Sequence, residues 1–275
     1  MATPSVSHAK SEAVTLRTLA KMKAAGTKIT SLTAYDASFA ALLDQAGVDV
    51  VLVGDTLGNV IQGHATTVPV TVDDIVYHTR AVARGLKRAF LIADMPFVSY
   101  PTPAIGLRNA ARMMQEGGAK MVKLEVNGHH AGIVRYLSEN AVPVCAHLGL
   151  RPQFVHKLGG FPVQGREAAA ARQMVEDAQL MEQSGADMLL LESVPQALGA
   201  EIAAKAKLPV IGIGAGPGVD GQILVLYDML DITLGHRPKF ARNFMQDAGS
   251  PAAAVAAFVQ AVRDGSYPAP EHCFD

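Results

Sequence analysis

The sequence predicts a single (β/α)₈ barrel, and three observations favour this fold. Eight short runs rich in Val, Ile and Leu recur along the chain, each followed by glycine or a polar residue. Such runs are typical of parallel strands that are covered on both faces. Amphipathic helical patterns separate most of the runs. The length of 275 residues agrees with the ~250 residues that such barrels need.

The strand candidates follow one another along almost the whole chain. They begin near Lys28 (KITSLT), Asp49 (DVVLVG), Ala89 (AFLIAD), Ala119 (AKMVKLE), Val142 (VPVCAH), Ala186 (ADMLLLE), Leu208 (LPVIGIG) and Gln222 (QILVLY). They are expected to close one catalytic barrel domain within residues 12–275, preceded by a frayed, solvated tail at residues 1–11. The alternative for this tail, an organelle transit peptide, is disfavoured by the early Glu12.

Helical patterns cover residues 12–25, 73–86, 103–116, 166–183, 195–206 and 251–263. The first places Leu16, Leu19 and Met22 at helical spacing before Gly26, and is expected to be a short N-terminal helix that closes one end of the barrel. Two aspartates open the second pattern, and prolines stand at the start of the third and fifth. Both features are typical of helix N-termini.

Composition and charge exclude several classes of function. Hydrophobic residues make up 49% of the chain and charged residues 18%, which suits a globular protein with a large core. A formal net charge of −1 and the absence of a Lys/Arg run argue against nucleic-acid binding. No apolar run approaches the ~20 residues that span a bilayer. Two cysteines, Cys145 and Cys273, are too few for a disulfide framework and favour a reducing, cytoplasmic setting.

Four acidic residues stand at the ends of apolar runs: Asp55, Asp94, Glu125 and Glu192. In a closed barrel, the first three come from consecutive strands and share one arc of the carboxyl-terminal rim, where barrel enzymes keep their chemistry. Three converging carboxylates repel one another unless a divalent cation binds them, and oxygen-only ligands favour Mg²⁺ or Mn²⁺. The alternative for each acid taken alone is a cap on the following helix.

Three side chains are expected to act beside the cation. Lys123 lies two residues before Glu125 and points to the same side of the strand, where it forms a salt bridge with an acid or binds a substrate carboxylate. Glu192 lies among apolar residues that are expected to raise its pKa toward that of a useful proton acceptor, with a helix cap as the alternative. His147 ends the fifth run, and is either a hydrogen-bond donor into the pocket or a satisfied core histidine.

Two long connections, residues 57–72 and 148–166, leave the second and fifth strands and are expected to cover the site. The glycine-rich segment GIGAGPG (212–218) lacks both the Lys-Ser/Thr ending of a Walker loop and an acid at the Rossmann spacing. Close packing is therefore preferred to phosphate binding for this segment. His64 lies in the first long connection, and the remaining histidines are interpreted as structural or surface residues: His78, His129, His130, His156, His236 and His272.

Seven motifs occur in a fixed order between Thr30 and Phe274: VGDTLGNVIQGH, LIADMPFVSY, MVKLE, VPVCAHLGLRPQ, LLLESVP, IGIGAGPGVDGQILV and PKFARNF, followed by EHCFD. In this order they closely resemble the ketopantoate hydroxymethyltransferase (3-methyl-2-oxobutanoate hydroxymethyltransferase) family. The resemblance implies a barrel of the phosphoenolpyruvate/pyruvate class. It also implies transfer of a hydroxymethyl group from 5,10-methylenetetrahydrofolate to 3-methyl-2-oxobutanoate, which gives 2-dehydropantoate in pantothenate synthesis. Mg²⁺, a cytoplasmic location and a homodecamer of two pentamers are implied as well.

Carried over by position, the family's metal ligands fall on Asp55, Asp94 and Glu125, its 2-oxo acid contacts on Asp55, Thr56, Asp94 and Lys123, and its proton acceptor on Glu192. Thr56 stands where the family more commonly has serine, and it keeps the hydroxyl. In the implied mechanism, Mg²⁺ polarises the keto carbonyl and Glu192 removes the C3 proton. The metal-stabilised enolate then attacks the methylene carbon of the folate.

Two other functions are compatible with the same scaffold. A Mg²⁺-dependent lyase or hydrolase would cleave a C–C bond in a 2-oxo or 2-hydroxy diacid, but such enzymes commonly use a reactive cysteine on a loop after a strand. Here Cys145 lies within a strand candidate and Cys273 near the end of the sequence. A non-catalytic barrel would need neither the four strand-end acids nor Lys123. Hydroxymethyl transfer is therefore the preferred hypothesis.

Overall fold

The computed structural model describes residues 12–235 and 237–275, which form a closed barrel of eight parallel strands in the order β1 to β8. The strands are β1 (Ile29–Thr33), β2 (Val50–Val53), β3 (Phe90–Asp94), β4 (Met121–Glu125), β5 (Val144–Gly149), β6 (Met188–Glu192), β7 (Val210–Ile213) and β8 (Gly221–Leu224). β8 closes the barrel on β1, with Gly221 opposite Ile29. The predicted tail at 1–11 and His236 lie outside the described residues.

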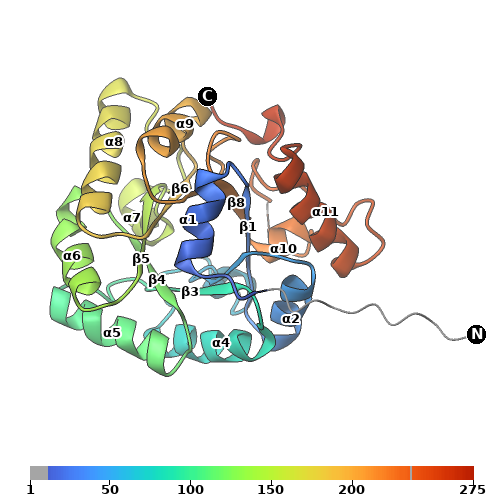
Figure 1. The fold of residues 1–275 in the computed structure, drawn as a ribbon, viewed down its shortest axis with the longest axis horizontal. Coiled ribbons are helices and arrows are strands. Elements are labelled where there is room, and N and C mark those ends of the chain that lie inside the picture. Colours follow the sequence, from blue (N-terminus) through green and yellow to red (C-terminus); the bar gives the residue numbers. More distant parts are fainter. Residues whose placement is uncertain (1–11, 236) are drawn as a thin grey trace, which may run out of the picture.

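Helices surround the barrel as a ring (Figure 1). They are α1 (Leu16–Ala24), α2 (Ala37–Gln45), α3 (Leu57–Val60), α4 (Val72–Gly85), α5 (Pro103–Gln115), α6 (Ala131–Glu139), α7 (Val155–Leu158), α8 (Ala168–Gln183), α9 (Gln196–Lys205), α10 (Leu226–Met229) and α11 (Pro251–Asp264), with short 3₁₀ turns η1 (Gly128–His130), η2 (Pro152–Phe154) and η3 (Pro270–His272). The predicted strands and helices are all present. The eighth strand is shorter than the QILVLY run, because Leu226 and Tyr227 begin α10.

Five of these helices lie outside the predicted ranges: α2, α6 and the four-residue helices α3, α7 and α10. The α2 helix begins at a side-chain cap, in which Asp36 accepts hydrogen bonds from the backbone N–H groups of Ser38 and Phe39 at 2.8 and 2.9 Å. It buries Ala40 and Leu43 against the barrel. Its nine residues give a short apolar pattern, which by periodicity alone is hard to distinguish from a loop beside a strand.

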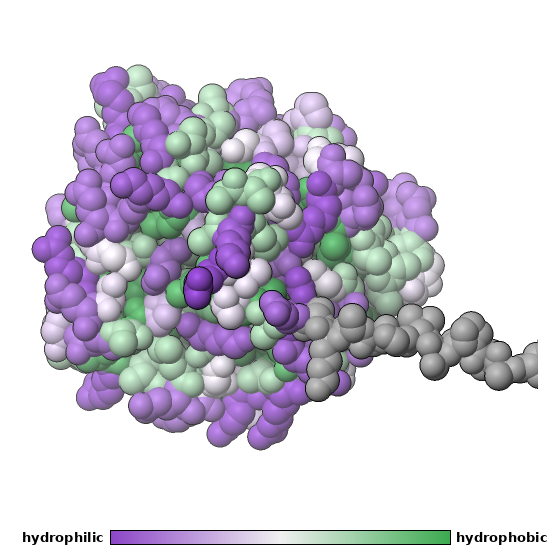
Figure 2. All heavy atoms as spheres, viewed as in Figure 1, coloured by the Kyte–Doolittle hydropathy of each residue, from purple (hydrophilic) through white to green (hydrophobic). Residues whose placement is uncertain are grey.

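The α1 helix covers the end of the barrel at which the strands begin. Lys23 Nζ lies 2.6 Å from Asp220 Oδ2 and donates to the carbonyl of Ala203 at 3.0 Å, and the backbone N–H of Val14 donates to the carbonyl of Arg88. Asp220 and Arg88 both stand just before a strand, so the predicted closure of one barrel end is confirmed. Figure 1 looks onto this end, where hydrophilic side chains are spread with small apolar patches between them (Figure 2).

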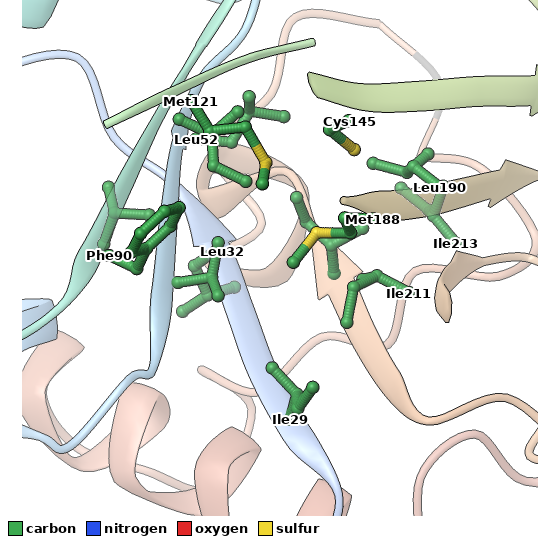
Figure 3. Packing of buried hydrophobic residues seen from close by; sticks show 14 of the residues in the cluster. Ile29, Leu32, Leu52, Phe90, Met121, Cys145, Met188, Leu190, Ile211 and Ile213 are labelled. Atoms are coloured by element: carbon green, nitrogen blue, oxygen red, sulfur yellow. The ribbon is translucent and has the colours of Figure 1, made fainter. Parts of the chain in front are cut away.

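The inside of the barrel changes character from its closed end to its open end. Met121, Cys145, Met188 and Ile211 come from neighbouring strands and are buried together in the apolar part (Figure 3). Every second side chain of a strand points to the same face, so the next inward side chain lies two residues closer to the carboxyl-terminal end. In β4 the inward side chains are Met121, Lys123 and Glu125. The apolar layer therefore forms the floor under a set of polar groups.

Candidate active site

A cavity of about 590 Å³ opens at the carboxyl-terminal ends of the strands. The structure brings all the predicted site residues to its wall: Asp55, Thr56, Asp94, Lys123, Glu125, His147 and Glu192. The closed barrel explains this convergence, because residues distant in sequence occupy neighbouring positions on one rim. The cavity is therefore the candidate active site.

The alternative interpretation of the four acids as helix caps is wrong. The helices after β2 and β6 begin without a side-chain cap, at Thr56 and Pro195. The helix after β3 is capped by Thr102, and the turn after β4 by Asn127. The acids are thus available to the cavity rather than to the local backbone.

Asp55, Asp94 and Lys123 form one buried ionic group. Lys123 Nζ lies 2.8 Å from Asp94 Oδ1, and the backbone N–H of Asp55 donates to Asp94 Oδ2 at 3.2 Å. Burial and the charge of Asp94 raise the pKa of Asp55 to about 7. Burial opposes the charge on Lys123, but the charges of Asp94, Asp55 and Glu125 outweigh it and raise the pKa of this lysine. The predicted salt bridge between Lys123 and an acid is confirmed.

Gln153, on η2 in the second long connection, forms hydrogen bonds with two of these acids. It is not one of the site residues predicted from the sequence. Its side-chain Nε2 donates to Asp55 Oδ2 at 2.8 Å and to the carbonyl of Met95 at 2.9 Å, and its backbone N–H donates to Glu125 Oε2 at 3.1 Å. The Tyr100 hydroxyl bonds to both Gln153 Oε1 and the carbonyl of Glu125. In the sequence, Gln153 is a polar residue in a loop, and no periodicity marks it.

Several properties of the carboxylates bear on whether they fit a cation. The Glu125 side chain is fully buried, its Oε1 atom has no hydrogen-bond partner, and its pKa is raised well above the ordinary value, first by burial and then by the charge of Asp55. An all-oxygen donor set with a free carboxylate oxygen suits a hard divalent cation. Among the described residues, however, no three His, Cys, Asp or Glu side chains already stand at metal-binding spacing. Lys123 and Gln153 occupy the oxygens of Asp94 and Asp55, so ligation by Asp55, Asp94 and Glu125 stays a prediction.

Glu192 and His147 face each other across the strands β6 and β5. His147 Nε2 lies 3.3 Å from Glu192 Oε2, and its Nδ1 lies 3.3 Å from Lys123 Nζ. Burial, aided by the charge of Lys123, lowers the pKa of His147 well below its usual value, so the ring is neutral. Because an ammonium group can only donate, Nδ1 accepts from Lys123 and the ring proton is on Nε2, which lies near Glu192 but makes no hydrogen bond to the described residues. His147 thus has the polar contacts that the pocket interpretation requires.

Burial raises the pKa of Glu192 to about 8, with Lys123 opposing the shift and the charges of Asp55, Asp94 and Asp228 adding to it. The expected rise is confirmed, and its side chain keeps 17% of its surface exposed, toward the cavity. One detail of the sequence prediction is wrong: His147 does not end its strand, because β5 continues to Gly149. Gly149 lies so close to β6 that an added Cβ would meet the carbonyl of Glu192 at 2.3 Å.

Both long connections contribute to the cavity wall, through Asn59, Val60, Ala65 and Thr67 from the first and Leu150, Pro152 and Phe161 from the second. A third part of the wall was not expected from the sequence. It consists of residues after β8 and near the end of the chain, including Asp228, Leu234, Phe240 and Phe274. Asp228 lies on the short helix α10, directly after the predicted strand run QILVLY.

The glycine-rich segment packs closely, as expected. A Cβ on Gly216 would meet the Cβ of Gln196 at 2.4 Å, and one on Gly218 would meet that of Ala200 at 2.5 Å. Cys145 is buried inside β5, and burial raises its pKa to about 12. Neither described cysteine lies on a loop directly after a strand, so the reactive cysteine expected of the lyase alternative is missing.

Residues 13–270 match a family model described as ketopantoate hydroxymethyltransferase. A 3-methyl-2-oxobutanoate hydroxymethyltransferase from Alkalilimnicola ehrlichii is 59% identical over 261 residues, which cover 95% of this chain and 94% of that protein. Two solved structures are also similar. Phosphonopyruvate hydrolase in complex with oxalate and Mg²⁺ has a TM-score of 0.59 at 16% identity, covering 94% of this chain and 93% of that one. A 2,3-dimethylmalate lyase of the PEP mutase/isocitrate lyase superfamily has a TM-score of 0.57 at 16% identity, covering 93% and 92%.

At this level of identity the two structures show the fold alone, which is a closed barrel of eight parallel strands. No helix in the described part of the chain combines the length and the apolar character that crossing a bilayer requires.

Proposed function

The chain belongs to the ketopantoate hydroxymethyltransferase family, and on that premise we propose that Glu192 acts as the proton acceptor on 3-methyl-2-oxobutanoate bound beside Lys123. The chain is an enzyme that transfers a hydroxymethyl group to this 2-oxo acid, a step of pantothenate synthesis. The observation that carries the assignment of roles is that the Glu192 carboxylate, the Lys123 ammonium and the three remaining acids face one cavity.

Glu192 has the properties of a base for a carbon acid. A carboxylate with a pKa of about 8 is a stronger base than an ordinary glutamate, and about a tenth of it is ionised at pH 7. His147 Nε2 lies 3.3 Å from one of its oxygens, while the exposed part of its side chain faces the cavity. Removal of the C3 proton by Glu192 leaves an enolate, whose C3 carbon becomes the nucleophile.

Lys123 and Thr56 provide the groups that hold the substrate. The Lys123 ammonium lies among the acids, and in the free protein its charge is balanced by Asp94. A substrate carboxylate gives it a second anionic partner on the cavity side. The hydroxyl of Thr56, next to Asp55 on the cavity wall, donates to the carboxylate or the keto oxygen.

Asp55, Asp94 and Glu125 would hold Mg²⁺. When it is bound, the cation polarises the keto carbonyl as a Lewis acid and lowers the energy of the enolate. The donor set consists of carboxylates alone, as Mg²⁺ prefers, and Glu125 keeps an unpartnered oxygen. The phosphonopyruvate hydrolase of the same fold was solved with Mg²⁺ and oxalate, a small dicarboxylate.

The one-carbon donor in this proposal is 5,10-methylenetetrahydrofolate. The enolate carbon forms a bond to the methylene carbon, the two bonds from that carbon to N5 and N10 of the folate break, and water supplies the hydroxyl group. The proton removed from C3 and the remaining proton of that water end on the two folate nitrogens. The products are 2-dehydropantoate and tetrahydrofolate. A cavity of about 590 Å³ lies within the range of roughly 300–1,000 Å³ for drug-sized ligands, so the small 2-oxo acid fills only part of it.

The proposal extends to the setting of the enzyme. Following the family resemblance, it works in the cytoplasm as a homodecamer of two pentamers, with residues 12–275 as a single catalytic domain. Sedimentation velocity of the purified protein tests the assembly, and a monomer at micromolar concentration would contradict it.

The test of the proposed chemistry is exchange of the C3 proton of 3-methyl-2-oxobutanoate with D₂O in the presence of Mg²⁺. Glu192→Gln keeps the shape of the side chain but removes the base, so exchange is expected to fall by about 10²–10⁴-fold, while calorimetry still detects binding of the 2-oxo acid. Glu201→Gln, on the exposed face of α9, is the matched control. Full exchange by Glu192→Gln would assign the base to another residue. Cleavage of oxaloacetate without C3 exchange by the wild type would favour the lyase.

A further inference from the structure

Part of the cavity wall is not used by the 2-oxo acid chemistry. Phe161, Leu234, Phe240 and Phe274 line this part beside Lys239, and we call these four apolar side chains the apolar end; they come from the second long connection, the segment after β8 and the last residues of the chain. Phe161 and Leu234 are 61% and 72% exposed, which is unusual for large apolar side chains on a cavity wall. A ligand with a flat apolar surface would cover them.

Part of the apolar end is held rigidly. The rings of Phe240 and Phe274 meet edge to face with centroids 6.4 Å apart. Both pack over Gly214, which has φ +61°, and an added Cβ there would come within 2.8 Å of Phe240 and 3.0 Å of Phe274. The Tyr267 hydroxyl donates to the carbonyl of Phe240 at 2.6 Å. These contacts fix the two aromatic rings before any ligand binds.

Of the residues that the structure describes, Asp228 is the one acid of the cavity wall besides the four strand-end acids. It lies on α10, is only 7% exposed, and belongs to the same cavity as Glu192. Its charge contributes to the raised pKa of Glu192, so the two carboxylates are close enough to interact. Burial raises the pKa of Asp228 itself, with Thr233 and Arg237 opposing the shift. A buried carboxylate requires donors; the Thr233 side chain supplies one, and the proposed mechanism adds none.

We propose that the apolar end binds the pterin ring of the folate co-substrate, with the carboxylate of Asp228 accepting hydrogen bonds from the N3–H and the 2-amino group of that ring. The inference rests on the proposed function, which requires a folate in this cavity. A pterin is planar and suits aromatic walls. It also presents two adjacent N–H donors on one edge, which match the two oxygens of a carboxylate. In this orientation the one-carbon unit points from the apolar end toward the substrate beside Glu192.

The experiment measures binding of tetrahydrofolate by calorimetry to the wild type and to Asp228→Asn. Asparagine keeps the shape but places an amide where the ring donors require acceptors, so the Kd for tetrahydrofolate is expected to rise about 10- to 100-fold. Asp247→Asn, an exposed acid of the same region, is the matched control and is expected to bind as the wild type does. Thermal unfolding checks that both variants are folded.

A second ligand separates recognition from a structural role. The 2-desamino-2-methyl analogue of tetrahydrofolate lacks one donor on the edge that Asp228 contacts. The wild type is expected to bind it about 10-fold or more weaker than tetrahydrofolate, whereas Asp228→Asn is expected to discriminate little between the two. A structural role for Asp228 would weaken both ligands equally.

The outcomes distinguish this inference from the proposed function. If the wild type exchanges the C3 proton of the 2-oxo acid and binds tetrahydrofolate, but Asp228→Asn binds and discriminates as the wild type does, the pterin site is wrong and the proposed function stands. If the wild type neither exchanges the proton nor binds tetrahydrofolate, the proposed function falls and the pterin site falls with it.

Discussion

At the scale of single residues, burial and neighbouring charges give the acids of the site different properties. Glu192 lies 3.3 Å from a neutral histidine and has a raised pKa of about 8, which suits the proposed role of a base. Asp94 is instead paired with Lys123 at 2.8 Å. In the proposed mechanism, the same type of side chain therefore serves proton transfer in one place and charge balance in another.

A substitution of Gln153 tests whether its hydrogen bond to Asp55 supports the proposed binding of Mg²⁺. In Gln153→Leu, the bond to Asp55 Oδ2 and the one to the carbonyl of Met95 are lost, and the buried oxygens lose their donor at a cost of about 1–3 kcal/mol. We predict that the Mg²⁺ concentration for half-maximal turnover rises about 5- to 100-fold, measured by titrating Mg²⁺ at saturating substrate.

Tyr100→Phe is the graded control for this prediction. It removes the hydroxyl that bonds to Gln153 Oε1 and to the carbonyl of Glu125 but leaves the bond to Asp55, so a smaller rise is expected. A Gln153→Leu enzyme that loses turnover with an unchanged Mg²⁺ requirement would show that Gln153 does not position the acids.

The two kinds of site residue differ in how predictable they are from sequence. Asp55, Asp94 and Glu125 directly follow or end apolar strands, and the strand end fixes their place on the rim. Gln153 and Asp228 lie on short helical turns, η2 and α10, in connecting segments. Their direction is set by the path of the whole loop against distant elements, which no local periodicity records.

At the scale of elements, the strands were the most predictable part, because continuous burial leaves a clear apolar run. The ends were less predictable. β5 runs two residues past His147, and β8 stops before Leu226. Such limits are set by hydrogen bonds to neighbouring strands, as in the pairing of Gly149 with Glu192, and these partners are far apart in the sequence.

Asp49 joins several elements at the closed end of the barrel. It is fully buried at the start of β2 and accepts from Arg88 Nη2 at 2.8 Å, from Arg263 of α11 and from the Thr30 hydroxyl of β1 at 2.9 Å. We predict that Asp49→Asn destabilises the protein by about 3 kcal/mol, because it removes the charge that two arginines share. Thermal or urea unfolding measures this loss.

The matched control is Glu201→Gln, which removes an exposed pair with Lys205 on α9 and is expected to change stability by less than about 1 kcal/mol. If Asp49→Asn were as stable as this control, the network would not hold β1, β2 and α11 together. Because Asp49 lies at the end opposite the cavity, Asp49→Asn should lower the stability of the protein without lowering the rate of C3 exchange by the folded variant.

At the scale of the whole molecule, the closed barrel places charge where it is least favourable for stability. Its apolar floor is continuous with the protein core, while the open end gathers four acids in one buried cavity. Sequence analysis could predict the barrel from the number of strands, but the degree of burial of each acid comes only from closure. That burial makes the stability of the ligand-free protein depend on pH.

Burial raises the pKa of Asp55 to about 7 and that of Glu192 to about 8, whereas such acids titrate near about 4 in an unfolded chain. Between these values the folded state retains protons that the unfolded state has released. The stability contributed by these two acids is therefore complete below about pH 4 and is lost as the pH rises through 7 and 8. His147 has a lowered pKa and acts in the opposite sense, but only below its unfolded value of about 6.5.

Above pH 7 His147 no longer contributes, and Mg²⁺ should reverse the effect of the acids. We predict that with EDTA the Tm falls between about pH 7 and about pH 8.5. Excess Mg²⁺ should raise the Tm more at the higher pH, because a cation binds ionised carboxylates and protonated ones must first release their protons. Scanning calorimetry at both pH values, with and without Mg²⁺, measures the difference. In Asp55→Asn both the fall and the rescue should shrink, since one titrating ligand is gone. A Mg²⁺ effect of equal size at both pH values, in the wild type and in Asp55→Asn, would mean that the cation binds somewhere other than this rim.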